Sequence, residues 1–125
     1  MTYNTIFFFG HHRCGTTWIS DICEDVCRES WLKYYKAHSP AKFNFDLKQF
    51  ITANKIDFLS YTNADWNYLS GIENYRGFHV TRDPRDIIVS SYFSHLHSHS
   101  TREWKEPIDH RKKLENTSRE EGLYL

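Results

Sequence analysis

A short apolar strand, a loop bounded by two glycines and an amphipathic helix follow one another at the start of the chain. Residues 6–9 form a continuous apolar run, typical of a strand buried on both faces of a sheet. The loop of residues 10–15 follows, and the spacing of apolar residues then predicts a helix over residues 16–28. The apolar residues with this helical spacing are Ile19, Ile22, Cys23 and Val26. Strand, glycine loop and helix together aim backbone N–H groups and a helix N-terminus at one point, where an anion can bind.

The rest of the chain continues the alternation of strands and helices. Strands are predicted at residues 57–62 and 77–81, and a further strand is one interpretation of residues 31–36. Asp46 with Gln49 resembles a capping box before a short helix that runs through Ile51. A later helix begins with Asp83 as its cap and Pro84 in its first turn. The sequence therefore predicts an α/β fold with a parallel sheet flanked by helices.

Composition limits the size and the partners of this fold. A chain of 125 residues fits one domain, and 16 Lys and Arg against 16 Asp and Glu give no net positive field for nucleic acid or an anionic membrane. No apolar run approaches the roughly 20 residues of a membrane helix. Three cysteines without framework spacing suit a reducing compartment, so we expect a cytoplasmic protein.

The last part of the chain differs in character. Most of residues 102–121 are charged or polar, which predicts solvated helices, so we divide the expected domain into a nucleotide-binding core of residues 1–100 and a charged helical tail of residues 101–125. Residues 117–120 look like a capping box that opens another helix, yet the sequence stops at Leu125. Since so short a helix is not stable alone, we expect the sequence to be the N-terminal part of a larger domain.

The glycine loop has the spacing of a nucleotide-binding Walker A loop without its lysine. Gly10 and Gly15 are separated by four residues, Thr16 stands at the lysine position, and the cation of the loop is Arg13. This argues against ordinary ATP or GTP hydrolysis but keeps an anion site. The alternative is a tight turn with no ligand. Cys14 lies at the helix N-terminus, where a thiol can be activated, but no partner pattern supports a nucleophile.

A second informative stretch spans residues 81–90. Arg82 falls at the end of a predicted parallel strand, where open α/β sheets bind ligands, and Ser90 lies on the second turn of the next helix. An arginine fork and a serine hydroxyl can converge on one phosphate. The alternative is that Asp83 only caps the helix while the arginines pair with Asp86 and other surface acids.

Together the two motifs resemble the sulfotransferase family, which uses 3′-phosphoadenosine 5′-phosphosulfate as its sulfuryl donor. Residues 9–18, FGHHRCGTTW, resemble the family's 5′-phosphosulfate loop, and residues 82–93 are similar to its 3′-phosphate motif. The resemblance covers about the first hundred residues and implies a P-loop nucleotide-kinase-like core. It implies that Arg82 and Ser90 hold the 3′-phosphate, and that the 5′-phosphosulfate is held by Arg13, Cys14, Gly15, Thr16 and Thr17.

The chain departs from the family pattern in three places. Many members carry Lys where Arg13 stands, although carbohydrate-directed branches use Arg there. The stretch at residues 60–66 has no histidine where cytosolic members place their catalytic one. No counterpart of the segment that closes over the adenine precedes Leu125.

The reaction that the resemblance implies is in-line transfer of a sulfuryl group to a hydroxyl or amine of a carbohydrate, lipid or small molecule, without a metal. Arg13 supplies charge, and Asp65 after the third strand is the candidate general base, with His79 a weaker one inside a strand. Asp65 is equally explained as a helix cap. Aromatic residues available to cover an acceptor are Trp66, Tyr68 and Trp104.

Two other functions stay open. One is a divergent P-loop kinase, against which the missing lysine weighs. The other is a module that binds the nucleotide and transfers nothing, favoured by the absent closing segment and the unassigned base.

Overall fold

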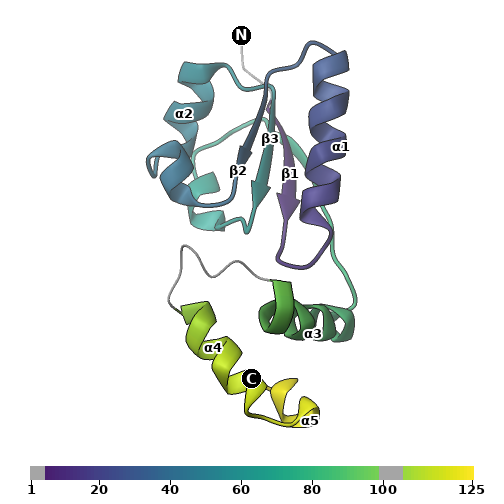
Figure 1. Cartoon of the computed structure of the whole chain (residues 1–125). Helices are drawn as coiled ribbons and strands as arrows, with labels where there is room; N and C mark the ends of the chain where they lie inside the picture. Colours follow the sequence, from purple (N-terminus) through teal and green to yellow (C-terminus); the bar gives the residue numbers. More distant parts are fainter. Residues whose placement is uncertain (1–4, 99–105) are drawn as a thin grey trace. The chain divides into compact units, whose positions relative to one another are not determined.

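The computed structural model describes residues 5–98 and 106–125 and divides the chain into two compact units (Figure 1). The N-terminal unit is Met1–Thr81 and the C-terminal unit is Arg82–Leu125. The strand–loop–helix motif belongs to the first unit, and the motif that contains Arg82 and Ser90 belongs to the second.

The N-terminal unit is built on a four-stranded sheet in which all three strand pairs are parallel. Its strands are β1 (Ile6–Gly10), β2 (Tyr34–Ala37), β3 (Phe58–Thr62) and β4 (Arg76–His79). Their order across the sheet is β2-β3-β1-β4, so β1 lies between β3 and β4. The prediction of an α/β fold with a parallel sheet flanked by helices is confirmed.

Helices cover both faces of this sheet (Figure 1). The helix α1 (Thr16–Glu29) lies on one face, where Cys27 packs with Phe8 of β1. The helix α2 (Leu47–Asn54) lies on the other face with two 3₁₀ turns, η1 (Pro40–Phe43) and η2 (Trp66–Leu69). Phe7 and Phe9 of β1 point to this second face and join its core. Because β1 is apolar on both faces, it forms the buried centre of the unit, as the apolar run predicts.

Several element boundaries differ from the predicted ones, because turns set them. Residues 31–33 are not a strand: Trp31 has a left-handed φ of 57°, and the Leu32 N–H donates to the Cys27 carbonyl at 2.9 Å, so these residues close the end of α1. The helix α2 extends beyond Ile51 to Asn54. The strand β4 ends at His79 rather than at residue 81, and its last paired residue on β1 is Phe9.

The C-terminal unit is helical. It contains α3 (Pro84–Phe93), a π-helical turn η3 (Ser94–Ser98), α4 (Glu106–Glu115) and α5 (Arg119–Gly122). Asp83 caps α3, as its sequence signal predicts. The cap of α5 is Ser118, one residue after Thr117, which opens the expected capping box. Gly122 allows α5 to approach α3, since a Cβ there would lie 2.8 Å from Tyr92 Cε2.

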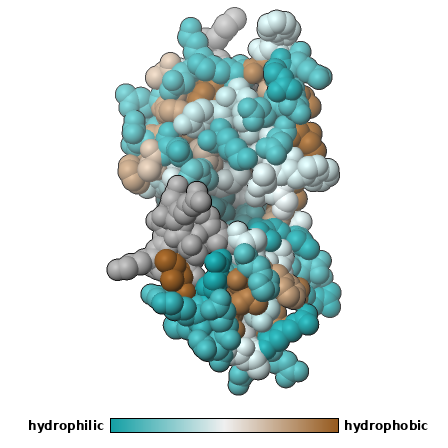
Figure 2. All heavy atoms as spheres, viewed as in Figure 1, coloured by the Kyte–Doolittle hydropathy of each residue, from teal (hydrophilic) through white to brown (hydrophobic). Residues whose placement is uncertain are grey.

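On the face that Figure 2 shows, hydrophilic residues cover most of each unit, with separate apolar patches among them. Among the described residues, none of the helices has the length and apolar character needed to cross a membrane.

Candidate anion-binding loop

The backbone of the loop between β1 and α1 changes hand from one residue to the next. Arg13 and Gly15 both adopt the left-handed conformation, with φ of 63° and 71°, and Cys14 stands between them. The Cys14 N–H donates to the His11 carbonyl at 3.3 Å and closes the turn. A change of backbone hand from one residue to the next aims successive N–H groups at one point, which is the geometry of an anion nest.

The first turn of α1 adds further donors to the loop. Gly15 is the N-cap residue and offers no side chain to satisfy the helix N-terminus. The Ile19 N–H donates to the Gly15 carbonyl at 3.0 Å and makes the first hydrogen bond of the helix. The N–H groups of residues 16–18 therefore have no carbonyl acceptor one turn earlier within the helix. These groups and the positive end of the helix dipole favour a negatively charged ligand.

Gly10 fixes how closely the helix approaches the strand. A Cβ at Gly10 would overlap Thr16 Cγ2 and would lie 3.2 Å from Thr16 Cβ. The first residue of α1 therefore sits directly against the last residue of β1, and the loop between them is held short. Within the loop Cys14 is buried, and Arg13 and Thr16 are half-buried.

The position of the loop in the sheet is the one at which α/β proteins bind ligands. From β1 the chain crosses to β2 on one side, whereas β4 lies on the other side of β1. The loop thus follows the strand at which the direction of winding reverses, at the carboxyl edge of the sheet. The turn after β3 meets it there, because the Asn63 N–H donates to the Gly10 carbonyl at 2.8 Å.

Asp65 lies beyond that turn and caps η2. Its Oδ1 accepts a hydrogen bond from the Asn67 N–H at 3.0 Å, so the capping role considered for this residue is confirmed. The aromatic neighbour Trp66 packs on Phe9 with ring centroids 4.9 Å apart and is half exposed. Burial raises the pKa of the nearby Tyr61, whose hydroxyl makes no hydrogen bond of good geometry.

His79 lies at the end of a strand and not inside one. It is the last residue of β4, it is exposed, and its ring meets the ring of His11 edge-on with centroids 4.4 Å apart. Sequence reasoning gave His79 little weight because the strand was predicted to continue to residue 81. The pairing of β4 with β1 ends at His79 and Phe9, although β1 continues to Gly10 beside β3, so no signal within residues 77–81 marks this strand end.

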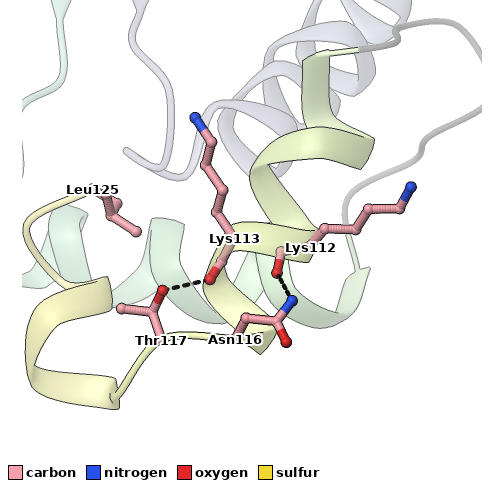
Figure 3. Close-up of a pocket in the computed structure, with 5 residues that line it drawn as sticks. All are labelled: Lys112, Lys113, Asn116, Thr117 and Leu125. Carbon is pink, nitrogen blue, oxygen red and sulfur yellow. Dashed lines mark hydrogen bonds between the residues drawn. The ribbon is translucent and has the colours of Figure 1, made fainter.

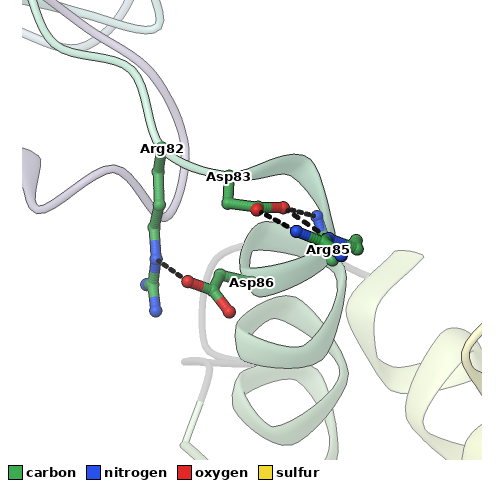
Figure 4. A network of polar contacts seen from close by, with 4 residues as sticks. All are labelled: Arg82, Asp83, Arg85 and Asp86. Atoms are coloured by element: carbon green, nitrogen blue, oxygen red, sulfur yellow. Dashed lines mark hydrogen bonds and ion pairs between the residues drawn. The ribbon is translucent and has the colours of Figure 1, made fainter.

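Arg82 and Ser90 belong to the C-terminal unit, where Arg82 precedes its first helix and Ser90 lies on that helix. Arg82 Nε lies 3.7 Å from Asp86 Oδ2 (Figure 4). Asp86 and Ser90 are four residues apart on α3 and share one helical face, whereas Arg82 precedes the helix and its cap Asp83. The structure thus places residues 13–17 in the N-terminal unit, and Arg82 and Ser90 in the C-terminal unit.

Arg85 has a different partner. Its guanidinium binds Asp83 at two points, Nη2–Oδ2 at 2.7 Å and Nε–Oδ1 at 3.1 Å (Figure 4). The Arg85 side chain, together with its backbone N–H, lowers the pKa of Asp83 below the ordinary value. Both arginines therefore make the acidic contacts that the alternative interpretation of this stretch expects.

A hollow of about 410 Å³ lies in the C-terminal unit, between α4 and the chain end (Figure 3). It is lined by Lys112, Lys113, Asn116, Thr117 and Leu125. The carbonyls of both lysines accept hydrogen bonds from the side chains of Asn116 and Thr117, at 2.7 and 2.5 Å. None of the candidate site residues lines this hollow, and Trp104 lies outside the described residues.

Comparisons with known proteins give no relative: no family model, no curated protein and no solved structure matches this chain. In residues 5–98 and 106–125 no three His, Cys, Asp or Glu side chains are grouped to hold a metal ion.

Proposed function

We propose that the chain binds 3′-phosphoadenosine 5′-phosphosulfate and transfers its sulfuryl group to a hydroxyl or amine of an acceptor. The observation that carries the proposal is the loop after β1, with left-handed backbone at Arg13 and Gly15 and a helix N-terminus behind it. This loop offers a cluster of N–H donors and one guanidinium but no Walker lysine. Such a donor set fits a phosphosulfate better than the β- and γ-phosphates of a nucleoside triphosphate.

The residues of the loop supply fixed positive potential to the reaction. Sulfuryl transfer, like phosphoryl transfer, passes through a loose, in-line transition state with charge spread over the outer oxygens, so positioning and electrostatics provide most of the rate. In this proposal the N–H groups of residues 15–17 and the guanidinium of Arg13 face that charge, because the Cys14 N–H is used by the His11 carbonyl. Arg13 supplies charge and hydrogen bonds but no proton, because an arginine side chain stays protonated.

Arg82 and Ser90 are proposed to hold the 3′-phosphate of the donor. The contact of Arg82 with Asp86, which shares a face of α3 with Ser90, supports this, as does the exposure of Arg82, whose side chain is 44% accessible. Its contact with Asp86 at 3.7 Å is longer than a hydrogen bond, and exposed ion pairs contribute only about 0–1 kcal/mol. A phosphate with two negative charges can therefore displace the carboxylate.

A binding module without transferase activity is the second candidate. It is favoured by Asp65, the base suggested by the sequence, because its carboxylate already caps η2. Such a module would bind the donor and its product but would not turn over.

Calorimetric titration with 3′-phosphoadenosine 5′-phosphate, with adenosine 5′-phosphate and with ATP and magnesium tests the proposal. We expect metal-independent binding that favours the 3′-phosphorylated nucleotide. Arg82→Ala should weaken that nucleotide at least about tenfold while leaving adenosine 5′-phosphate within twofold, because charge-assisted hydrogen bonds contribute about 1.5–3 kcal/mol. Arg85→Ala is the matched control, since its guanidinium is held by Asp83.

Two results would contradict this assignment. An equal loss of both nucleotides in Arg82→Ala would refute the 3′-phosphate role of Arg82. Preference for ATP with magnesium would favour a kinase over a sulfotransferase.

A further inference from the structure

The two histidines at the carboxyl edge of the sheet form a pair that the sequence pattern does not reveal. Phe9 of β1 is the register partner of His79 on β4, so both side chains point to the face covered by α2. His11 follows Phe9 by two residues and extends the same row, and its ring contacts the ring of His79. The pair thus stands on the α2 side of the anion-binding loop, of which His11 is the first residue after the strand.

The two imidazoles differ in their freedom to reach a ligand. His79 is exposed, whereas His11 is half-buried and its carbonyl accepts the N–H of Cys14 in the turn. The residue before His79 on the same face is Gly77, which has no side chain to cover it. His79 therefore presents its ring to solvent at the mouth of the loop, and His11 supports that ring from the side.

We propose that His79 is the general base that removes the proton from the acceptor hydroxyl or amine, and that His11 is a positioning residue that holds the His79 ring. This inference rests on the proposed function, because it requires a sulfuryl donor in the loop. A ring nitrogen of an exposed histidine can accept a proton from a bound acceptor, which is the role of a general base. Asp65 is in addition engaged as the cap of η2.

With a hydroxyl acceptor, proton removal accompanies the transfer of the sulfuryl group. A ring nitrogen of His79 takes the hydroxyl proton while the acceptor oxygen forms a bond to sulfur. The bond between sulfur and the bridging oxygen breaks, and its electron pair stays on the 5′-phosphate of the leaving nucleotide, where Arg13 and the loop N–H groups stabilise it. The resulting imidazolium then releases its proton to solvent.

Water can serve as the probe acceptor, because hydrolysis of the donor needs the same proton removal and requires no identified substrate. The assay follows release of 3′-phosphoadenosine 5′-phosphate from 3′-phosphoadenosine 5′-phosphosulfate by the full chain, with nucleotide affinity measured in parallel by calorimetry. In His79→Ala we expect the release rate to fall about 100-fold or more, with nucleotide affinity within twofold of the unaltered chain. Added imidazole should restore a substantial part of the lost rate to this variant.

Matched variants separate chemistry from folding. His38→Ala is the control, because His38 is an exposed histidine directly after β2, two strands from β1 at the same edge of the sheet. It should keep the full rate and show no response to imidazole. His11→Phe keeps an aromatic ring against His79 and should retain most of the rate, whereas His11→Ala should lose it about tenfold without a change in nucleotide affinity.

Each other outcome refutes a defined part of the proposal. Unchanged release in His79→Ala, or a loss that imidazole does not restore, overturns the role of His79 alone. Nucleotide binding without any release by the unaltered chain also overturns it and leaves the donor site standing. Absence of nucleotide binding overturns the proposed function itself.

Discussion

The contact between Gly10 and Thr16 leads to a quantitative prediction about the loop. A Cβ at position 10 would overlap Thr16 Cγ2 and would lie 3.2 Å from Thr16 Cβ and 3.3 Å from Phe8 Cζ. Thr16 is β-branched and begins a helix, so its methyl group has few other rotamers to adopt. Gly10→Ala should therefore cost about 1–3 kcal/mol of unfolding free energy, the usual range for overpacking a well-packed site.

A second substitution shows whether this contact is the cause. Thr16→Ser removes Cγ2 and keeps the hydroxyl, so the overlap disappears and only the two contacts of 3.2 and 3.3 Å remain for the alanine at position 10. In that background Gly10→Ala should cost less than about 1 kcal/mol, which gives a coupling energy of about 1–2 kcal/mol between the two positions.

Urea unfolding followed by tryptophan fluorescence measures this cycle. Trp18, on the first turn of α1, and Trp66, packed on Phe9, both report on the N-terminal unit. Nucleotide affinity, measured on the same four proteins, should fall in the Gly10→Ala single variant and recover in the double variant. If Gly10→Ala lowers the unfolding free energy equally with Thr16 and with serine at position 16, the reasoning is refuted. The contact with Thr16 Cγ2 would then not be what makes position 10 intolerant of a side chain.

Three further predictions concern single side chains. Tyr61→Phe should leave the unfolding free energy unchanged or raise it by up to about 1–3 kcal/mol, because the buried hydroxyl lacks a well-formed hydrogen bond; urea midpoints test this, and a clear loss of stability would contradict it. Burial also raises the pKa of Tyr61, so the stability that its neutral phenol contributes is present below the ordinary tyrosine value of about 10 and is lost as pH rises through the folded value. Alkaline unfolding should therefore begin at higher pH in Tyr61→Phe, with Tyr124→Phe, at an exposed tyrosine, as the unchanged control. Because the pKa of Asp83 is lowered, the stability that its carboxylate contributes is present above the ordinary value of about 3.9 and is lost as pH falls through the folded value. The helical circular dichroism of the unaltered chain should therefore fall over that acid range. A signal equally acid-sensitive in Asp83→Asn would contradict this. Asp86→Asn should strengthen binding of 3′-phosphoadenosine 5′-phosphate, because it removes the carboxylate that lies beside Arg82; weaker binding would show that Asp86 orients the guanidinium instead.

Periodicity and capping signals predicted most of the fold. The run at residues 6–9 became the central strand, the helical spacing of Ile19 and Cys23 became α1, and Asp83 caps α3 as expected. These features depend on local sequence, so a single sequence is enough to predict them. The order of the strands was not predicted, because it depends on which strands pair, and no local pattern encodes that.

The parts of the candidate site that the sequence left undecided depend on strand ends. The end of β4 at His79 is set by its pairing with β1, whose last pair is Phe9 and His79, and this is a property of the paired strands rather than of residues 77–81. The contact between His11 and His79 joins residues 68 positions apart, so it could be found only from the folded structure. The role of Asp65 as a cap, by contrast, is local and was foreseen as one of its two interpretations.

The left-handed backbone of Arg13 implies a conflict between stability and binding within the loop. A side chain at φ of 63° costs roughly 1–2 kcal/mol relative to glycine. Arg13→Gly should therefore yield a more stable chain that has lost its loop cation, whereas Arg13→Ala keeps the strain and loses the charge. Comparison of these two variants separates the contribution of the guanidinium from the cost of its backbone. The sequence thus keeps at position 13 a residue that lowers the stability of the chain, because in the proposed function its guanidinium is needed to bind the anion.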